Sequence, residues 1–169
     1  GGRSLKLAEV KRRLGKVERA IEKAIEAGEL PGAVVMAQMG EELSFHHATG
    51  AATLSPERIE ARLSTIYDLA SLTKVIATTT LAMRAVDEGR LTLDDPIKQW
   101  LREWRGADRD AVTIRDLLAH SSGLTAYLPF FRDYTGRFEF EHAIGSLPLE
   151  YVPRSQSIYS DLGFMLLGF

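Results

Sequence analysis

A serine and a lysine stand three residues apart in Ser71-Leu72-Thr73-Lys74, the only Ser-x-x-Lys pattern in the sequence. If this segment begins a helix, the two side chains face the same side, because positions i and i+3 are neighbours on a helix surface. The lysine could then accept the hydroxyl proton or stabilise an alkoxide, which would make Ser71 a nucleophile. Free N–H groups at the helix start would stabilise a developing oxyanion. The pattern alone also fits a helix start with an exposed lysine.

The triplet Tyr159-Ser160-Asp161 is a second group that could do chemistry. A nearby lysine lowers the pKa of a tyrosine, and such a tyrosine can act as general base toward a serine. The same triplet also fits an ordinary half-buried tyrosine, since Ser160 or Asp161 would cap a helix that begins there.

The elements that must position these residues begin with a helix and a β-hairpin. Apolar residues recur every three or four positions over residues 7–25, which is typical of an amphipathic helix. Residues 33–37 and 43–47 predict two strands, with residues 40–42 as the connection between them. A polar loop is expected over residues 53–64.

The rest of the chain predicts helices. The pattern over residues 72–88 is helical, although it contains three consecutive threonines, which are poor helix formers. Further helices are expected over residues 97–104 and 114–120, and Thr113 is a good N-cap for the second. Residues 162–169 form an apolar run that should be buried.

The segment His120-Ser121-Ser122-Gly123-Leu124 follows the last residues of one predicted helix. Its serines and glycine are typical of a helix end followed by a tight turn. We predict a structural role for it and do not take His120 as a catalytic base.

The composition excludes several classes of function. The 169 residues carry 21 Lys and Arg against 23 Asp and Glu, so neither a nucleic-acid partner nor an anionic membrane surface is indicated. No apolar run approaches the roughly 20 residues of a membrane span. With no cysteine, and with His46 and His47 pointing to opposite faces of a predicted strand, we predict no metal site and no cofactor. The compartment stays open between a soluble cytoplasmic protein and an exported one whose signal has been removed.

Taken together, the motifs resemble the serine β-lactamase-like family, which includes class C β-lactamases, D-alanyl-D-alanine peptidases and related family VIII-type carboxylesterases. The similar segments are IYDLASLTK (66–74), VDEGRLTLDDPI (86–97), VTIRDLL with HSSGL (112–124) and YSDLGF with LLG (159–168). They cover most of residues 30–169. The resemblance implies an α+β fold of the β-lactamase and penicillin-binding-protein type.

The resemblance also implies roles for individual residues. Ser71 would attack a carbonyl carbon and form an acyl-enzyme, with its own backbone N–H as one oxyanion donor. Lys74 and Tyr159 would share the proton transfers. Asp161 would occupy a substrate-binding position, and residues 120–124 would shape a wall of the site. The implied substrate is a small-molecule ester, a β-lactam or a D-amino-acid peptide.

Two single residues depart from the family pattern. Asp161 stands where the family usually has Asn, and an ionised carboxylate can only accept hydrogen bonds, whereas an amide can donate to a substrate carbonyl. An acidic group there would also favour the protonated form of a nearby lysine. Arg154 follows Pro153 where the family commonly has Gly, which concerns the turn.

A larger departure concerns the sheet. The family's third motif, a Lys/His-(Ser/Thr)-Gly triplet on a central strand, has no counterpart in the sequence, and a lone hairpin is marginally stable. We therefore expect the N-terminal portion of such an enzyme. Residues 1–64 would supply a helix and hairpin of its α/β part, and residues 65–169 the nucleophile helix and the all-helical region. The remaining strands would come from a second polypeptide or from a portion of the protein not in this sequence.

The sequence thus predicts a serine hydrolase that forms an acyl-enzyme through Ser71, with Lys74 and Tyr159. Two alternatives remain open: a non-catalytic binding or regulatory protein that keeps the scaffold, and an inert fragment of such an enzyme. The intact catalytic residues argue against the first alternative, whereas Asp161 argues for it.

Overall fold

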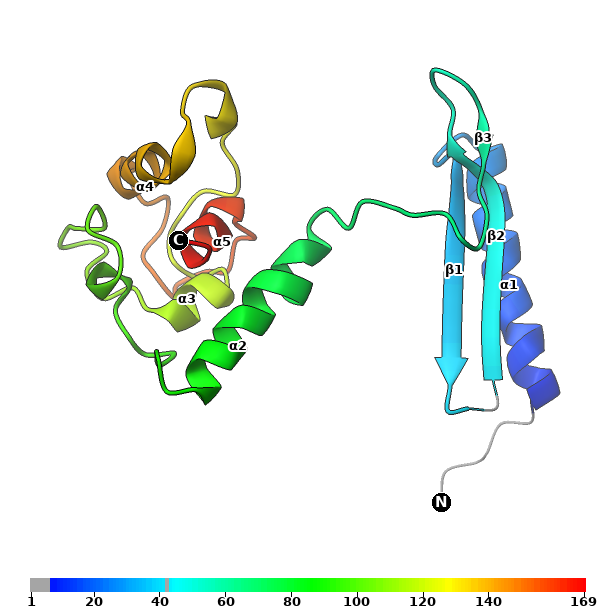
Figure 1. Cartoon of the computed structure of the whole chain (residues 1–169), viewed down its shortest axis with the longest axis horizontal. Helices are drawn as coiled ribbons and strands as arrows, with labels where there is room; N and C mark the ends of the chain where they lie inside the picture. Colours follow the sequence, from blue (N-terminus) through cyan, green and yellow to red (C-terminus); the bar gives the residue numbers. More distant parts are fainter. Residues whose placement is uncertain (1–6, 42) are drawn as a thin grey trace. The chain divides into compact units, whose positions relative to one another are not determined.

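The computed structural model describes residues 7–41 and 43–169, and the chain forms two compact units (Figure 1). One unit ends at Asp68 and the other runs from Leu69 to Phe169. Residues 1–6 of the predicted first region and Glu42 of the predicted hairpin connection lie outside the described residues.

The first unit is a helix packed on an antiparallel sheet. Helix α1 (Leu7–Glu26) is the predicted amphipathic helix, and strands β1 (Gly32–Met39) and β2 (Leu43–Thr53) form the predicted hairpin, with Val34 opposite Ala48. The helix lies along the hairpin and contacts mainly β2 (Figure 1).

Strand β2 is longer than predicted, and the expected loop over residues 53–64 contains a short third strand, β3 (Ile59–Glu60), paired with β2. The added part of β2 consists of Ala, Thr and Gly, which carry no apolar alternation, so the sequence pattern ends the strand too early. Gly50 lies in this part with a φ of 74°, a left-handed conformation that glycine adopts without steric cost. A Cβ there would collide with the carbonyl oxygen of Pro31.

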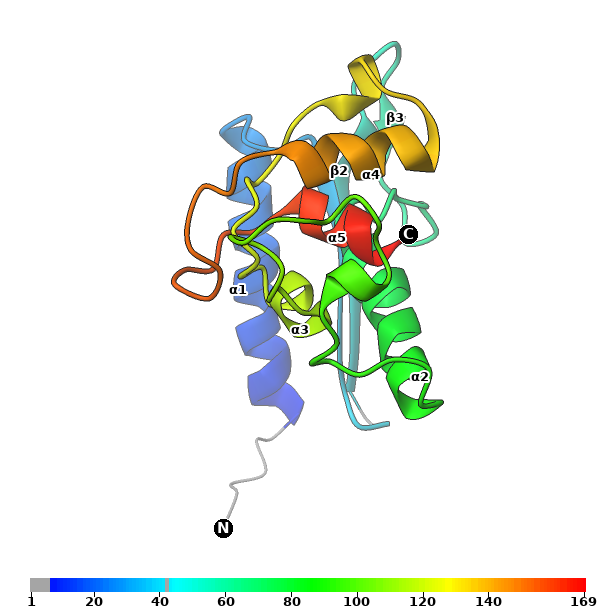
Figure 2. The same cartoon turned by 90° about the vertical axis from the view of Figure 1, so that its left-hand side faces the viewer.

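The second unit is built from helices around one apolar core. Its elements are, in chain order, the π-helical turn η1 (Lys74–Thr79), α2 (Thr80–Asp87), the 3₁₀ turn η2 (Ile97–Gln99), α3 (Ile114–Leu118), the 3₁₀ turn η3 (Phe130–Arg132), α4 (Gly136–Ser146) and α5 (Asp161–Leu167). Both views place α5 between α3 and α4 (Figure 1, Figure 2). The buried core side chains are Ile97, Leu101, Trp104, Val112, Ile114, Leu117, Leu124, Phe130, Ala143, Ile144, Leu162 and Leu166.

The helices of this unit confirm part of the prediction. Thr113 caps α3 as expected, because its side chain accepts the N–H of Asp116 while the Asp116 carboxylate accepts the N–H of Thr113. The prediction that the apolar run over residues 162–169 is buried is confirmed in part: Leu162, Phe164 and Leu166 are buried, whereas Met165, Leu167 and Phe169 are half-buried. The predicted helix over residues 97–104 is wrong beyond its first turn. There the chain bends so that the Trp104 indole N–H donates to the Arg109 carbonyl, at 2.9 Å.

Threonines shape the helix that follows the candidate nucleophile. The hydroxyls of Thr79 and Thr80 donate to the carbonyl oxygens of Lys74 and Val75, five residues earlier, at 2.8 and 3.2 Å. Threonine side chains compete in this way for backbone carbonyls within a helix. The five-residue spacing is that of a π-helix, which η1 adopts. The predicted helix therefore exists, but its first turns are wider than those of an α-helix.

Arg109 is a buried charge that joins the end of α4 to the loop before α3. Its side chain is 7% exposed and donates to the carbonyl oxygens of Gly145 and Leu147 at 2.7 and 2.8 Å. The guanidinium lies 5.2 Å from the centre of the Trp104 ring and pairs with Asp108 at 2.9 Å.

Among the described helices, none is both long and apolar enough to cross a bilayer.

Replacing Arg109 by Met should lower the free energy of unfolding by about 3 kcal/mol, because two buried carbonyl groups lose their donors. Urea unfolding followed by tryptophan fluorescence measures this. The matched control is Arg115→Met, which removes an exposed guanidinium paired with Asp94 on the surface and should leave the midpoint nearly unchanged. Equal losses in the two variants would contradict the role given to Arg109.

Candidate active site

Ser71 and Lys74 lie together where the chain enters the helix formed by η1 and α2, the candidate nucleophile helix. Lys74 is the first residue of η1, and its Nζ donates to the Oγ of Ser71 at 3.3 Å. Ala70, just before the serine, has a φ of 45°, which a residue other than glycine rarely adopts. Backbone held in such a conformation is a feature of functional sites, because the surrounding structure must impose it.

Tyr159 and Asp161 reach the same place from the start of α5. The Asp161 carboxylate pairs with Lys74 Nζ at 2.6 Å. The Tyr159 ring centre lies 4.9 Å from the same nitrogen. The structure thus brings together all four residues that the sequence singles out, and Lys74 contacts the other three.

The charges of this cluster shift two pKa values in opposite directions. Hydrogen bonds to Lys74 and then to Ser71 lower the pKa of Tyr159, helped by the attraction of the ammonium. For Lys74, partial burial opposes the charged form, but hydrogen bonds to Asp161 and Tyr159 and the attraction of both outweigh it, so its pKa is raised. The arrangement therefore stabilises an ammonium at Lys74 and makes a phenolate at Tyr159 easier to form.

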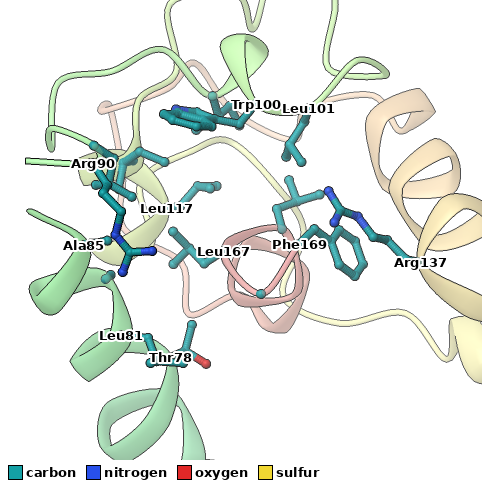
Figure 3. A pocket seen from close by; sticks show the side chains of 16 residues that line it. Thr78, Leu81, Ala85, Arg90, Trp100, Leu101, Leu117, Arg137, Leu167 and Phe169 are labelled. Atoms are coloured by element: carbon teal, nitrogen blue, oxygen red, sulfur yellow. The ribbon is translucent and has the colours of Figure 1, made fainter.

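A hollow of about 370 Å³ adjoins these side chains. Its lining residues are Ala70, Ser71, Thr73, Lys74, Thr78, Asp161, Phe164 and Met165. A larger cavity of about 450 Å³ lies between α2, α3 and α5, and Figure 3 shows it with Arg90 and Arg137 on opposite sides of an otherwise mainly apolar lining. That lining does not include Ser71, Lys74 or Asp161. We therefore place the candidate active site at the smaller hollow.

Residues 119–126 support the segment that carries Tyr159. The N–H of Glu150 donates to the carbonyl oxygen of Gly123, and the backbone N–H of Arg154 donates to the carbonyl oxygen of Ser121. Further along, the N–H of Asp161 donates to the carbonyl of Ala126, at 2.8 Å. Gly123 has a φ of 92°, and a Cβ there would collide with the carbonyl of Tyr151. Arg154, where the family commonly has Gly, has a φ of 71°.

Sequence reasoning missed the contact of His120 with this site. Its ring lies 4.6 Å from that of Tyr159 and 4.9 Å from that of Phe164, centre to centre. Its Nδ1 accepts the backbone N–H of Ser160 at 3.0 Å. A histidine far from Tyr159 in the sequence gives no spacing signal for such a contact.

The two histidines considered for a metal lie in the first unit. His47 Nδ1 is 3.3 Å from a Glu18 carboxylate oxygen, and His46 is exposed. Across residues 7–41 and 43–169, no group of three His, Asp or Glu side chains is placed to hold a metal ion.

Comparison with known proteins places this geometry in context. Residues 17–169 match the family described as β-lactamase. A protein of Escherichia coli O157:H7 with the provisional name D-alanyl-D-alanine carboxypeptidase is 31% identical over 176 residues, which cover 93% of this chain and 40% of that protein. The N-acetylmuramyl-L-alanine amidase of Bacillus subtilis (strain 168) is 28% identical with the same coverage.

Among solved structures, a class C β-lactamase superposes with a TM-score of 0.78 at 23% identity, over 99% of this chain and 45% of that one. The chain thus spans less than half the length of these similar proteins. The likeness confirms the predicted α+β fold of the β-lactamase type.

Removing the Lys74 ammonium should remove the main cause of the lowered pKa of Tyr159. In a Lys74→Met variant we expect the pKa of Tyr159 to rise toward its ordinary value, because Lys74 is the largest cause of its lowering. Near-ultraviolet phenolate absorbance during a pH titration reports this, after subtraction of a Tyr159→Phe curve for the other tyrosines. The control Lys98→Met removes a lysine paired with Asp110 instead. An unchanged Tyr159 curve in Lys74→Met would contradict the assigned geometry.

Proposed function

This chain belongs to the β-lactamase family, and from that membership we propose that it acts as a serine acyl hydrolase through Ser71. The observation that carries the proposal is the meeting of a serine hydroxyl, a tyrosine hydroxyl and a carboxylate around one lysine ammonium. A hydroxyl nucleophile with an adjacent proton acceptor and a fixed cation is an arrangement that can catalyse acyl transfer.

In the proposed first step, Tyr159 in its phenolate form takes the proton of Ser71 while Ser71 Oγ bonds to the acyl carbonyl carbon. The Lys74 ammonium stabilises the negative charge on both oxygens during this transfer. When the tetrahedral intermediate collapses, the bond to the leaving group breaks and Tyr159 returns the proton to it. Water then attacks the acyl-enzyme with the same base, which frees the acid and restores Ser71.

Asp161 supports this assignment of the base. Its carboxylate, 2.6 Å from Lys74 Nζ, stabilises the ammonium and so disfavours the neutral amine that a lysine base would need. Tyr159, whose pKa is lowered, is the remaining candidate to accept the serine proton.

The proposed substrates share an acyl carbonyl next to a leaving group: a D-amino-acid peptide, a β-lactam or a small ester. We favour a peptide, in keeping with the carboxypeptidase name of one relative. Asp161 can only accept hydrogen bonds when ionised, and a peptide offers N–H groups to such an acceptor, whereas a simple ester offers none. Completion of the sheet by a second polypeptide stays a prediction.

A non-catalytic binding protein is the second candidate, and Asp161 is the observation that favours it. An acidic residue in this position changes the hydrogen bonds available to a substrate carbonyl, which could abolish turnover while the scaffold still binds peptides. Covalent labelling of Ser71 separates the two candidates.

Protein carrying this sequence should become acylated at Ser71 by an activated ester and by a β-lactam, and phosphonylated there by a fluorophosphonate, which loses fluoride. Intact-mass spectrometry detects the adduct, and peptide mapping locates it. We expect the rate of labelling to fall by about a hundredfold or more in Tyr159→Phe, because proton transfer to a positioned base is lost.

The matched controls are two serine variants. Ser71→Ala should abolish labelling, and Ser155→Ala, which removes an exposed hydroxyl that donates to Val152 in a turn, should leave it unchanged. Equal labelling of Ser71→Ala and the parent would exclude the proposed nucleophile. Absence of any adduct in the parent would favour the binding protein.

A further inference from the structure

We propose that His120 is a positioning residue that holds Tyr159 against Lys74 and Ser71, an inference that rests on the proposed function of this site. His120 does not touch the reacting atoms in this role. It fixes the place and direction of the tyrosine that does.

Tyr159 needs such a support because the backbone around it has no regular secondary structure to fix its side chain. It lies just before α5, and it is 52% exposed. An exposed side chain on irregular backbone samples several rotamers unless contacts select one. The Tyr159 ring contacts two groups: its centre lies 4.9 Å from Lys74 Nζ and 4.6 Å from the centre of the His120 ring.

The backbone of His120 is joined to the tyrosine segment on both sides. Its carbonyl oxygen accepts the hydroxyl of Tyr151 at 3.0 Å and the N–H of Ile158, next to Tyr159, at 2.9 Å. His120 itself has a φ of 54°, a left-handed conformation that residues with a side chain adopt uncommonly. This fixes the direction in which the imidazole leaves the chain.

The imidazole then fixes the residue on the other side of Tyr159. Its Nδ1 accepts the N–H of Ser160 at 3.0 Å, and Ser160 is only 1% exposed, so water does not replace this acceptor. Tyr159 is thus held by hydrogen bonds from both of its neighbours, Ile158 and Ser160, to the same histidine. The ring of that histidine lies between Tyr159 and Phe164.

This role requires a neutral histidine with its proton on Nε2, because Nδ1 needs its lone pair to accept the Ser160 N–H. Three titratable groups face His120: Lys74, Asp161 and Tyr159. Burial and then the Lys74 charge lower the pKa of His120, and Asp161 offsets this in part. The surroundings therefore favour the form that the hydrogen bond needs.

Two substitutions separate the contributions of the hydrogen bond and the ring. His120→Asn keeps an acceptor near the Nδ1 position and tolerates positive φ well, but it removes the ring. His120→Phe keeps a ring and removes the acceptor. The matched control is His142→Asn, which alters an exposed histidine paired with Glu103 at 2.9 Å on α4.

Two readouts are measured for each variant: the pKa of Tyr159 from phenolate absorbance, and kcat and KM for ester hydrolysis. We expect His120→Phe to raise the pKa of Tyr159 and to lower kcat by about a hundredfold with little change in KM, since a small displacement of the base costs that much. His120→Asn should recover part of both, and His142→Asn should match the parent.

A merely structural histidine would lower thermal stability without moving the pKa of Tyr159. That result, in a folded His120→Asn or His120→Phe protein, would overturn the proposal. The titration needs no catalysis, so it remains decisive if the parent shows no acylation of Ser71. In that case the proposed function fails, and a raised Tyr159 pKa in the variants still supports the positioning role.

Discussion

The ion pair between Lys74 and Asp161 is the interaction on which the rest of the site depends. An ammonium that is 16% exposed needs a nearby anion, and Asp161 supplies it at 2.6 Å from the first residue of α5. The pair joins the start of the nucleophile helix to the start of α5. Tyr159, two residues before Asp161, is thereby brought to the same nitrogen. Asp161 and Tyr159 raise the pKa of Lys74 because both lie beside its ammonium, and the same ammonium lowers the pKa of Tyr159.

Hydrogen bonds within the second unit hold the two helix starts in place. Three hydrogen bonds fix the start of α5. The hydroxyl of Ser160 accepts the N–H of Gly163 and donates to the carbonyl oxygen of Thr125. The N–H of Asp161 donates to the carbonyl oxygen of Ala126. On the other side, threonine hydroxyls widen the first turns of the nucleophile helix. The apolar core of the unit lies beneath the start of α5, through Leu162, and the described residues of η1 and α2 contribute no buried residue to it. Fold and chemistry therefore depend on the same short segments.

The sequence predicts the chemical residues better than their support. Ser71 and Lys74 share one helical turn and Tyr159 shares a triplet with Asp161, so local spacing makes them candidates, and the family resemblance of the ordered motifs implies their roles. The role of His120 depends on a turn and on hydrogen bonds to residues far along the chain, which no local spacing encodes. The predicted helix over residues 97–104 fails for a related reason: the Arg105 guanidinium donates to the carbonyl oxygens of Lys98 and Leu101, which backbone N–H groups would occupy in an α-helix. Helix α4 escapes prediction because its apolar residues follow no clean helical period.

The central claim is that Lys74 is a fixed cation and Tyr159 the base. Nuclear magnetic resonance of isotope-labelled lysine side chains tests it most directly, with Lys74→Arg used to assign the signal. We expect Lys74 to stay an ammonium through neutral pH and to titrate above the exposed lysines, and we expect Asp161→Asn to lower the pKa of Lys74. A Lys74 signal that titrates below the exposed lysines, toward neutral pH, would contradict the account and make the lysine amine the base.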